Sequence, residues 1–190
     1  MLLAFIVGYL LGAVPVALLV ARRYGVDLFQ TGDGNPGAWN ALEQLGARRA
    51  APAFIGDGLK ALVAGLLGRW LGDWWTGYAA VAGAMVGHAF PVWTGFRGGK
   101  SVMTFVGGAF ALAPEAAAIC LALCLVVSLA HSFTWGARVG VFAFPLVQLA
   151  TDPVEHVAAT GALMTLIGLL FLLRRRPVPA TAAAGAARTM

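Results

Sequence analysis

Long apolar stretches, separated by short polar segments, run along the whole chain of 190 residues. A helix needs about 20 residues to cross the roughly 30 Å hydrocarbon core of a bilayer. Two of the apolar stretches, the fourth and the sixth, are shorter than that, so they are predicted to be tilted, broken or re-entrant, with six or five full spans as the alternatives. The pattern predicts seven spans, at residues 1–21, 50–68, 77–93, 102–114, 117–133, 139–151 and 157–173.

The first apolar stretch is predicted to be a retained span and not a cleaved secretory signal. No basic residue precedes it, and Arg22 and Arg23 follow it directly. A signal peptide has the opposite order of charge and ends at a small-residue cleavage site.

Composition supports a membrane protein and excludes most other classes. Hydrophobic residues make up 60% of the chain and charged residues 11%, with a mean hydropathy of +0.83, whereas about a quarter of the residues in a soluble domain are charged. Disorder and a disulfide scaffold are excluded as well, because the apolar fraction is high and only two cysteines are present. The predicted fold class is all-α: a polytopic helix bundle forming one domain over residues 1–176, followed by a disordered cytoplasmic tail at 177–190.

The charged residues predict how the bundle is oriented. With the N-terminus outside and the C-terminus in the cytoplasm, eleven of the 13 basic residues fall on the cytoplasmic side, as the positive-inside rule requires. The net charge of +5 is therefore a sign of topology, and nucleic acid is not expected as a partner. The acidic residues of the predicted outer loops are Asp73, Glu115, Asp152 and Glu155.

Two glycine-containing segments on the predicted cytoplasmic side are candidates for binding phosphate. Residues 31–40 combine glycine, asparagine and proline, which permit a left-handed backbone and close approach to a ligand. In residues 96–101, Gly98 and Gly99 precede Lys100, and a helix begins after Ser101. Exposed amides, a lysine and a helix N-terminus together suit an anion. Ordinary turns are the alternative interpretation of both segments.

A few polar residues lie inside the predicted spans or at their cytoplasmic ends. Asp57 and Lys60 are three residues apart and therefore share one helical face, while His88, Ser128 and His131 lie near the inner ends of two other spans. Ionisable groups in a membrane are costly and usually face the protein interior or a polar cavity. A structural ion pair is the alternative for Asp57 and Lys60. All these groups gather with the glycine segments at the predicted cytoplasmic face.

The motifs appear in an order that resembles one family. Together they are similar to the bacterial membrane acyl-phosphate:glycerol-3-phosphate acyltransferase family (PlsY), from about residue 8 to residue 135. A further serine-containing family motif resembles Val127–Ala130. The four principal motifs are Gly34–Asn40, Gly56–Lys60, Gly87–Pro91 and Phe96–Lys100.

The resemblance implies transfer of a fatty acyl group from acyl phosphate to the 1-hydroxyl of glycerol 3-phosphate, which gives lysophosphatidic acid. It implies seven helices in the bacterial inner (plasma) membrane, a site facing the cytoplasm, membrane lipids as partners, and no cofactor or metal. Because acyl phosphate is already activated, no protein nucleophile is required. The residues expected in the site are Lys100 and Ser128 as catalytic groups, and Asn35, Gly37, Asn40, Asp57, Lys60, His88, Gly98, Gly99 and Ser101 as substrate-binding groups.

Several positions depart from the family pattern. Asp33 stands where the family typically has serine, Glu43 stands where an arginine is expected, and Arg174–Arg176 replace a C-terminal histidine and asparagine. Two negative charges near a phosphate site oppose substrate binding. A divergent paralogue, which binds a lipid precursor or has an accessory role, is therefore one alternative, and a small transporter that uses Asp57 and Lys60 is another.

Overall fold

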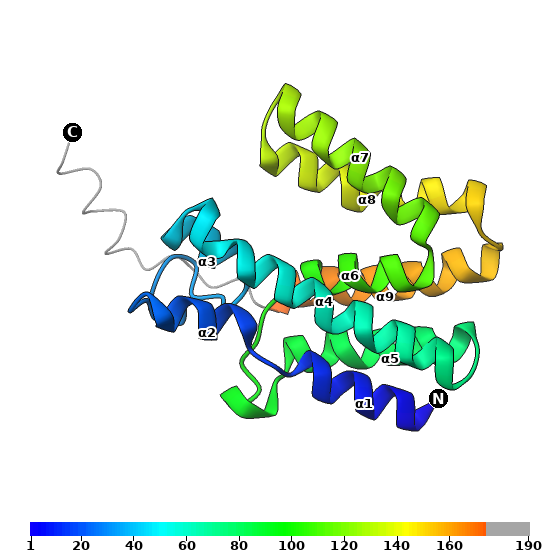
Figure 1. The fold of residues 1–190 in the computed structure, drawn as a ribbon, viewed down its shortest axis with the longest axis horizontal. Helices are drawn as coiled ribbons and strands as arrows, with labels where there is room; N and C mark the ends of the chain where they lie inside the picture. Colours follow the sequence, from blue (N-terminus) through cyan, green and yellow to red (C-terminus); the bar gives the residue numbers. More distant parts are fainter. Residues whose placement is uncertain (174–190) are drawn as a thin grey trace.

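The protein is a bundle of helices, seen in a computed structural model that describes residues 1–173 (Figure 1). Within those residues the chain forms helices, turns and loops and no strand. The tail predicted at 177–190 and Arg174–Arg176 lie outside the described residues. The helices are α1 (Leu2–Gly12), α2 (Val16–Arg23), α3 (Ala38–Leu45), α4 (Ala47–Leu71), α5 (Trp74–Ala89), the 3-10 helix η1 (Val92–Thr94), α6 (Val102–Leu112), α7 (Pro114–Ala130), α8 (Phe133–Thr151) and α9 (Val154–Leu173).

Each predicted span corresponds to an apolar helical segment, with two differences in detail. The first span is divided into α1 and α2 because Pro15 has no amide hydrogen and interrupts the helical hydrogen bonding. The sixth is not short, because α8 begins at Phe133 and runs for 19 residues. By contrast α6, with 11 residues, is about 16 Å long, which is too short to cross a bilayer. Four segments are long and apolar enough to do so: Leu2–Arg23, α4, α8 and α9.

Glycines allow α1 and α5 to pack with their backbones in close contact. A Cβ atom added at Gly12 would overlap the carbonyl of Ala84, and one added at Gly87 would overlap that of Tyr9. Small residues spaced by four commonly form such helix contacts in membranes, where close packing replaces the hydrophobic driving force. Four glycines make this contact: Gly8, Gly12, Gly83 and Gly87.

We expect Gly12→Val to loosen this contact and destabilise the protein by about 1–3 kcal/mol, because a backbone carbonyl cannot move aside as a side chain can. Thermal unfolding in detergent measures the effect. Gly161→Val in α9 is the matched control, since a Cβ at Gly161 would have no neighbour within 4 Å. Equal melting temperatures for the two variants would contradict the assignment of this contact.

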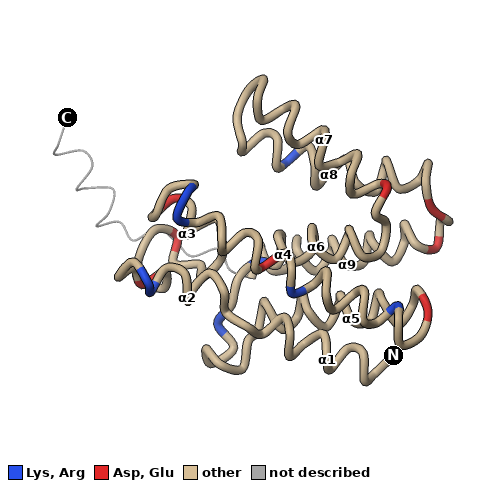
Figure 2. Tube along the Cα trace, viewed as in Figure 1, with Lys and Arg blue, Asp and Glu red and all other residues tan. Residues whose placement is uncertain are grey.

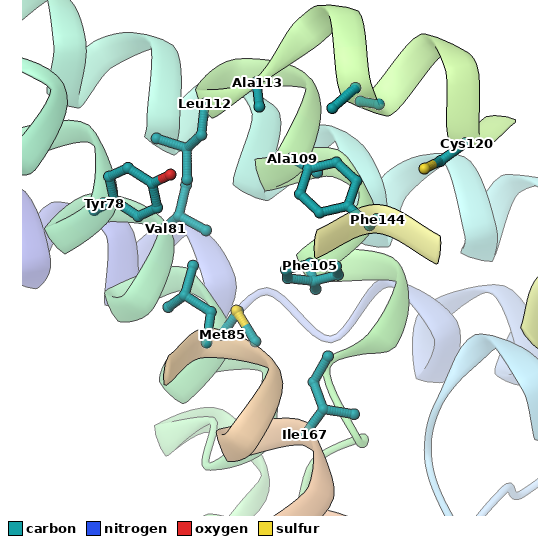
Figure 3. Packing of buried hydrophobic residues seen from close by; sticks show 13 residues of the cluster. Tyr78, Val81, Met85, Phe105, Ala109, Leu112, Ala113, Cys120, Phe144 and Ile167 are labelled. Atoms are coloured by element: carbon teal, nitrogen blue, oxygen red, sulfur yellow. The ribbon is translucent and has the colours of Figure 1, made fainter. Parts of the chain in front are cut away.

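The main hydrophobic core lies where α5, α6, α7, α8 and α9 meet. Val81 and Met85 of α5 are fully buried against Phe105 of α6, and the Phe105 ring meets Phe144 of α8 edge to face, with the centroids 5.6 Å apart (Figure 3). The paired helices α7 and α8 stand to one side of the bundle in Figure 1. This hairpin joins the rest of the protein through α6 and α9.

Most basic residues lie at one end of the bundle. Acidic residues at the starts of α5, α7 and α9 lie at the end where α1 begins, near Arg69 of α4, whereas the basic residues of α2 and of the start of α4 lie at the opposite end, which also carries the acidic residues of the α2–α3 loop and of α3 (Figure 2). Asp73 caps α5: the amide and hydroxyl of Thr76 donate hydrogen bonds to it and hold the pKa of this carboxyl below its ordinary value. The cap is thus expected to weaken only in strong acid, as pH falls through that lowered pKa.

Candidate active site

The first glycine-containing loop joins α2 to α3, and the side chain of Asn40 organises it. The Asn40 carboxamide nitrogen donates to the carbonyls of Leu28, Thr31 and Asn35 at 2.9–3.1 Å. Asp33 forms a local turn, in which its Oδ1 accepts from the Asn35 amide at 3.0 Å. Asn40 is fully buried, and its hydrogen bonds to three carbonyls hold the loop in this conformation.

The second loop, residues 95–101, lies directly on His88. The Gly99 amide donates to the His88 carbonyl at 3.1 Å, and a Cβ at Gly99 would overlap the His88 ring. Ser101 adopts a left-handed backbone with φ 61°, and its buried hydroxyl donates to the Met85 carbonyl at 2.7 Å. The Gly99 amide and the Ser101 hydroxyl therefore hold the loop in place in this structure. That Gly99 and Ser101 also bind substrate stays a prediction.

Lys100 joins the two loops. Its Nζ lies 3.1 Å from Oδ2 of Asp33, and a Cβ at Gly37 would lie 3.8 Å from Cα of Gly99. The Phe171 ring of α9 also lies beside this ammonium, with its centroid 4.7 Å from Nζ. The lysine is thus presented between the loops at the basic end of the bundle, with an acidic neighbour as its counter-ion.

A buried cluster of three ionisable side chains lies beneath the second loop. Lys60 Nζ donates to Asp57 Oδ1 at 2.9 Å, to His88 Nδ1 at 2.6 Å and to the Val14 carbonyl at 3.2 Å. Exposed fractions are 1% for Asp57 and 8% for both Lys60 and His88. An ammonium has three N–H groups, so these contacts use all of them. The predicted shared helical face of Asp57 and Lys60 is confirmed, and His88 joins them from α5.

The Val14 carbonyl accepts from Lys60 because of a local feature of the sequence. Pro15 interrupts the helix between α1 and α2, which leaves carbonyls near the break without their usual helical donors. The proline was visible in the first apolar stretch, but its link to Lys60 depends on how α1 packs against α4. Phe171 gave no sequence signal, because it looks like any other apolar residue of the last span.

The space beside this cluster is too small for a substrate. A recess of about 10 Å³ lies between the α1–α2 break, the cluster and Gly98–Gly99, and that volume corresponds to roughly one water molecule. Among residues 1–173, no three His, Cys, Asp or Glu side chains gather in a way that could hold a metal ion. The recess therefore has no room for a phosphate-sized ligand in this structure.

Ser128 is separate from this arrangement. Its hydroxyl donates to the Cys124 carbonyl at 2.6 Å, inside α7. Within the described part of the chain it makes no hydrogen bond to Lys100 or to either loop. The structure therefore brings together the residues of four sequence motifs and leaves Ser128 on the α7–α8 hairpin.

A large apolar cavity begins close to the loops. Its volume is about 530 Å³, and residues of α3, α4, α6, α7 and α8 line it. Val102, two residues after Lys100, is one of them, as is Phe133 at the start of α8. The Phe133 ring stacks on Trp39 with centroids 5.8 Å apart and meets Phe54 edge to face at 6.0 Å. A polar, cationic site and an apolar cavity thus adjoin at the same end of the bundle.

Comparisons with known proteins agree with this combination. The model of a family described as glycerol-3-phosphate acyltransferase matches residues 2–183. The chain belongs to that family. A glycerol-3-phosphate acyltransferase of Rubrobacter xylanophilus is 41% identical over 164 residues, which cover 83% of this chain and 81% of the relative. One from Neisseria meningitidis serogroup C is 39% identical over 180 residues, covering 91% and 88%.

Solved structures of a family member have the same fold. The glycerol 3-phosphate form of PlsY (YgiH), an integral membrane glycerol 3-phosphate acyltransferase, has a TM-score of 0.78 at 26% identity and covers 96% of this chain and 98% of its own. The lysophosphatidic acid form of the same protein has a TM-score of 0.75 at 28% identity, with coverage of 92% and 87%. The predicted family is thereby confirmed, and the chain is an acyltransferase and not a transporter.

The contact between Asp33 and Lys100 makes a prediction about substrate affinity. We expect Asp33→Asn to lower the KM for glycerol 3-phosphate about two- to tenfold, because the carboxylate competes with the substrate phosphate for the lysine. Asparagine keeps an oxygen that can accept from the Asn35 amide, so the turn is preserved. Initial rates over a range of glycerol 3-phosphate concentrations measure the change.

Glu43→Gln is the charge-matched control for this experiment. Glu43 Oε1 accepts from the Trp39 indole at 3.0 Å, a bond that glutamine can keep, and the residue makes no ion pair within the described residues. Its KM is expected to stay within about twofold of the native value. A KM that rises in Asp33→Asn would show that the carboxylate assists binding, against this account.

Proposed function

We propose that this chain transfers a fatty acyl group from acyl phosphate to the 1-hydroxyl of glycerol 3-phosphate and forms lysophosphatidic acid and inorganic phosphate. One observation carries the proposal: Lys100 stands between two glycine-containing loops, at the point where a large apolar cavity begins. Both substrates have a phosphate, and one of them has a long apolar chain. A site with a cationic part and an adjoining apolar part matches that pair of substrates.

The polar part of the site offers several groups for a phosphate. Lys100 supplies a mobile point charge. The helix α3 begins at Ala38, and its N-cap Gly37 has no side chain to cap it, so the first backbone amides have no intrahelical acceptor and suit an anion. The carboxamide oxygens of Asn35 and Asn40 have no hydrogen-bond partner within residues 1–173. Both oxygens are buried within the loop, so the groups that this part of the site presents to a substrate phosphate are Lys100 and the first amides of α3.

The apolar cavity suits the acyl chain of the donor. Its volume of about 530 Å³ lies in the usual range of ligand sites, roughly 300–1,000 Å³. Because Val102 lines the cavity and Lys100 is two residues away, an acyl chain in the cavity places the reacting acyl carbon of the donor beside the site where Lys100 binds glycerol 3-phosphate. The aromatic rings of Trp39, Phe54 and Phe133 lie at this junction between the polar and apolar parts.

The reaction requires little covalent chemistry from the protein. The glycerol hydroxyl attacks the acyl carbon, the new ester C–O bond forms, and the bond from that carbon to the phosphate oxygen breaks. The hydroxyl proton leaves with the released phosphate, so no protein base is needed. Lys100 neutralises the phosphate of glycerol 3-phosphate and stabilises the negative charge that develops on the donor during attack. The two loops hold the substrates close to each other. Ser128 is assigned no step.

The proposed location is the inner membrane of a bacterium, with the site facing the cytoplasm. The support is the position of basic residues: Arg22, Arg23, Arg48 and Arg49 lie at the same end of the bundle as the two loops (Figure 2). Basic residues collect on the cytoplasmic side of membranes. Accessibility of single cysteines to an impermeant reagent in intact cells tests this orientation.

The acyl donor has two candidates, acyl phosphate and acyl coenzyme A, because the apolar cavity suits the acyl chain of either one. Initial rates of the purified protein in lipid, with acyl phosphate and with acyl coenzyme A as donors, separate the candidates. We expect lysophosphatidic acid from acyl phosphate alone. Product from acyl coenzyme A and none from acyl phosphate would contradict the proposed donor.

A further inference from the structure

The apolar cavity has two distinguishable ends. Along α6 its lining runs from Val102, beside Lys100, to Phe110, a distance of about 12 Å at 1.5 Å per residue. Along the antiparallel helix α7 it runs in the opposite sense, from Cys124 back to Ala117. We call the end at Val102 and Cys124 the near end, and the end at Phe110 and Ala117 the far end.

The far end is closed by tightly packed residues. Helices α6 and α7 are joined there through Ala113, which is 2% exposed, and Phe144 of α8, which is 3% exposed, lies beside Ala109 and Cys120 (Figure 3). Ala117 lies in the same buried cluster. The open part of the cavity is its flank, where Ile55 of α4 and Leu121 of α7 are both well exposed. A chain that enters at the near end therefore meets the packed core in the lengthwise direction, while one side of the chain faces the open flank.

Small side chains at the far end of the cavity leave room for the end of an acyl chain. Ala109, Ala117, Cys120 and Gly140 are the small lining residues toward the far end, while the large ones there are Phe110 and Phe144. Each further methylene buried in an apolar pocket strengthens binding roughly fourfold, so the depth of the pocket sets a preference for chain length. The volume of only a few side chains sets that depth.

We propose that the far end of this cavity sets the length of the acyl chain that the enzyme transfers, and that Ala117 and Phe144 are specificity-determining residues. The inference rests on the proposed function, because it takes the acyl chain of the donor as the occupant of the cavity. A bulky side chain at Ala117 shortens the pocket from its closed end. Removing the ring of Phe144 extends the pocket in the same direction.

The test is a competition between hexadecanoyl phosphate and dodecanoyl phosphate in equal amounts, with the two lysophosphatidic acid products quantified by mass spectrometry. Ala117→Phe is expected to lower the ratio of long to short product at least about tenfold relative to the native enzyme. Ala118→Phe is the matched control, because Ala118 is exposed on the outer side of the same helix. Its ratio is expected to stay within about twofold of the native one.

Phe144→Ala provides the opposite change and keeps the test decisive if Ala117→Phe does not fold. It is expected to favour octadecanoyl over hexadecanoyl phosphate by several-fold more than the native enzyme does. An unchanged ratio in an active Ala117→Phe or Phe144→Ala enzyme overturns the inference, as does an equal shift in Ala118→Phe. Failure of the native enzyme with every acyl phosphate would instead reject the proposed function, so the two failures are distinguishable.

Discussion

Replacing Lys100 by alanine is expected to lower kcat/KM for acyl transfer about 10²–10³-fold, the usual effect of removing one group that stabilises charge in a transition state. The reason is positional. Lys100 is the cation that lies between the two loops, with Asp33 at 3.1 Å as its only carboxylate partner within the described residues. The measurement is the initial rate of lysophosphatidic acid formation in lipid at several concentrations of both substrates.

Two further variants separate this role from a general effect of charge. Lys100→Arg keeps the positive charge but replaces the compact ammonium by a larger, planar guanidinium group. The rate of this variant is therefore expected to lie between those of the native enzyme and the alanine variant. Arg48→Ala removes one exposed cation from the start of α4, outside the loops, and is expected to keep nearly full activity. The assignment fails if Lys100→Ala and Arg48→Ala have similar rates.

Removing Asp57 is expected to have the largest effect on stability. Asp57→Ala leaves the Lys60 ammonium buried with only the His88 nitrogen and the Val14 carbonyl as partners. Breaking a buried ion pair from one side costs about 3–5 kcal/mol, because the remaining charge is uncompensated. The expected result is a much lower melting temperature in detergent and a low yield of folded protein.

The double variant Asp57→Leu with Lys60→Leu tests whether Asp57 and Lys60 form a structural ion pair. It is expected to recover about 1–3 kcal/mol relative to the sum of the single changes, because neither charge is left alone. Its kcat is nevertheless expected to be lower than that of the native enzyme. Lys60 positions the His88 ring, and the His88 carbonyl accepts a hydrogen bond from Gly99 in the loop that contains Lys100. Single variants as stable as the native protein would show that the cluster does not support the fold.

The fold was largely predictable because the membrane constrains it. Apolar stretches long enough to be helices can be located from hydropathy alone, and the seven predicted positions match helical segments of the structure. The beginning of α8 was missed because Ser132, Trp135 and Arg138 lower the hydropathy of its first turns. The helix α3 was not predicted at all. It has only eight residues and directly follows a loop rich in turn-forming residues.

The candidate site was only partly predictable. The spacing of Asp57 and Lys60 fixes their contact, since residues three apart are neighbours on any helix. No local pattern could place Asp33 beside Lys100, because 67 residues separate them and the contact depends on how the two loops pack. The sequence indicated a conflict of charge at Asp33. The structure shows how the protein accommodates it, as a counter-ion for the lysine.

The central claim is that Lys100 and the two glycine-containing loops bind the phosphate of glycerol 3-phosphate. An experimental structure of this chain with glycerol 3-phosphate bound tests it most directly. The account predicts a phosphate within hydrogen-bonding distance of Lys100 Nζ, near the start of α3, with the ion pair between Lys100 and Asp33 broken. A phosphate bound elsewhere, for example at Arg22 and Arg23, with that ion pair intact, would contradict it.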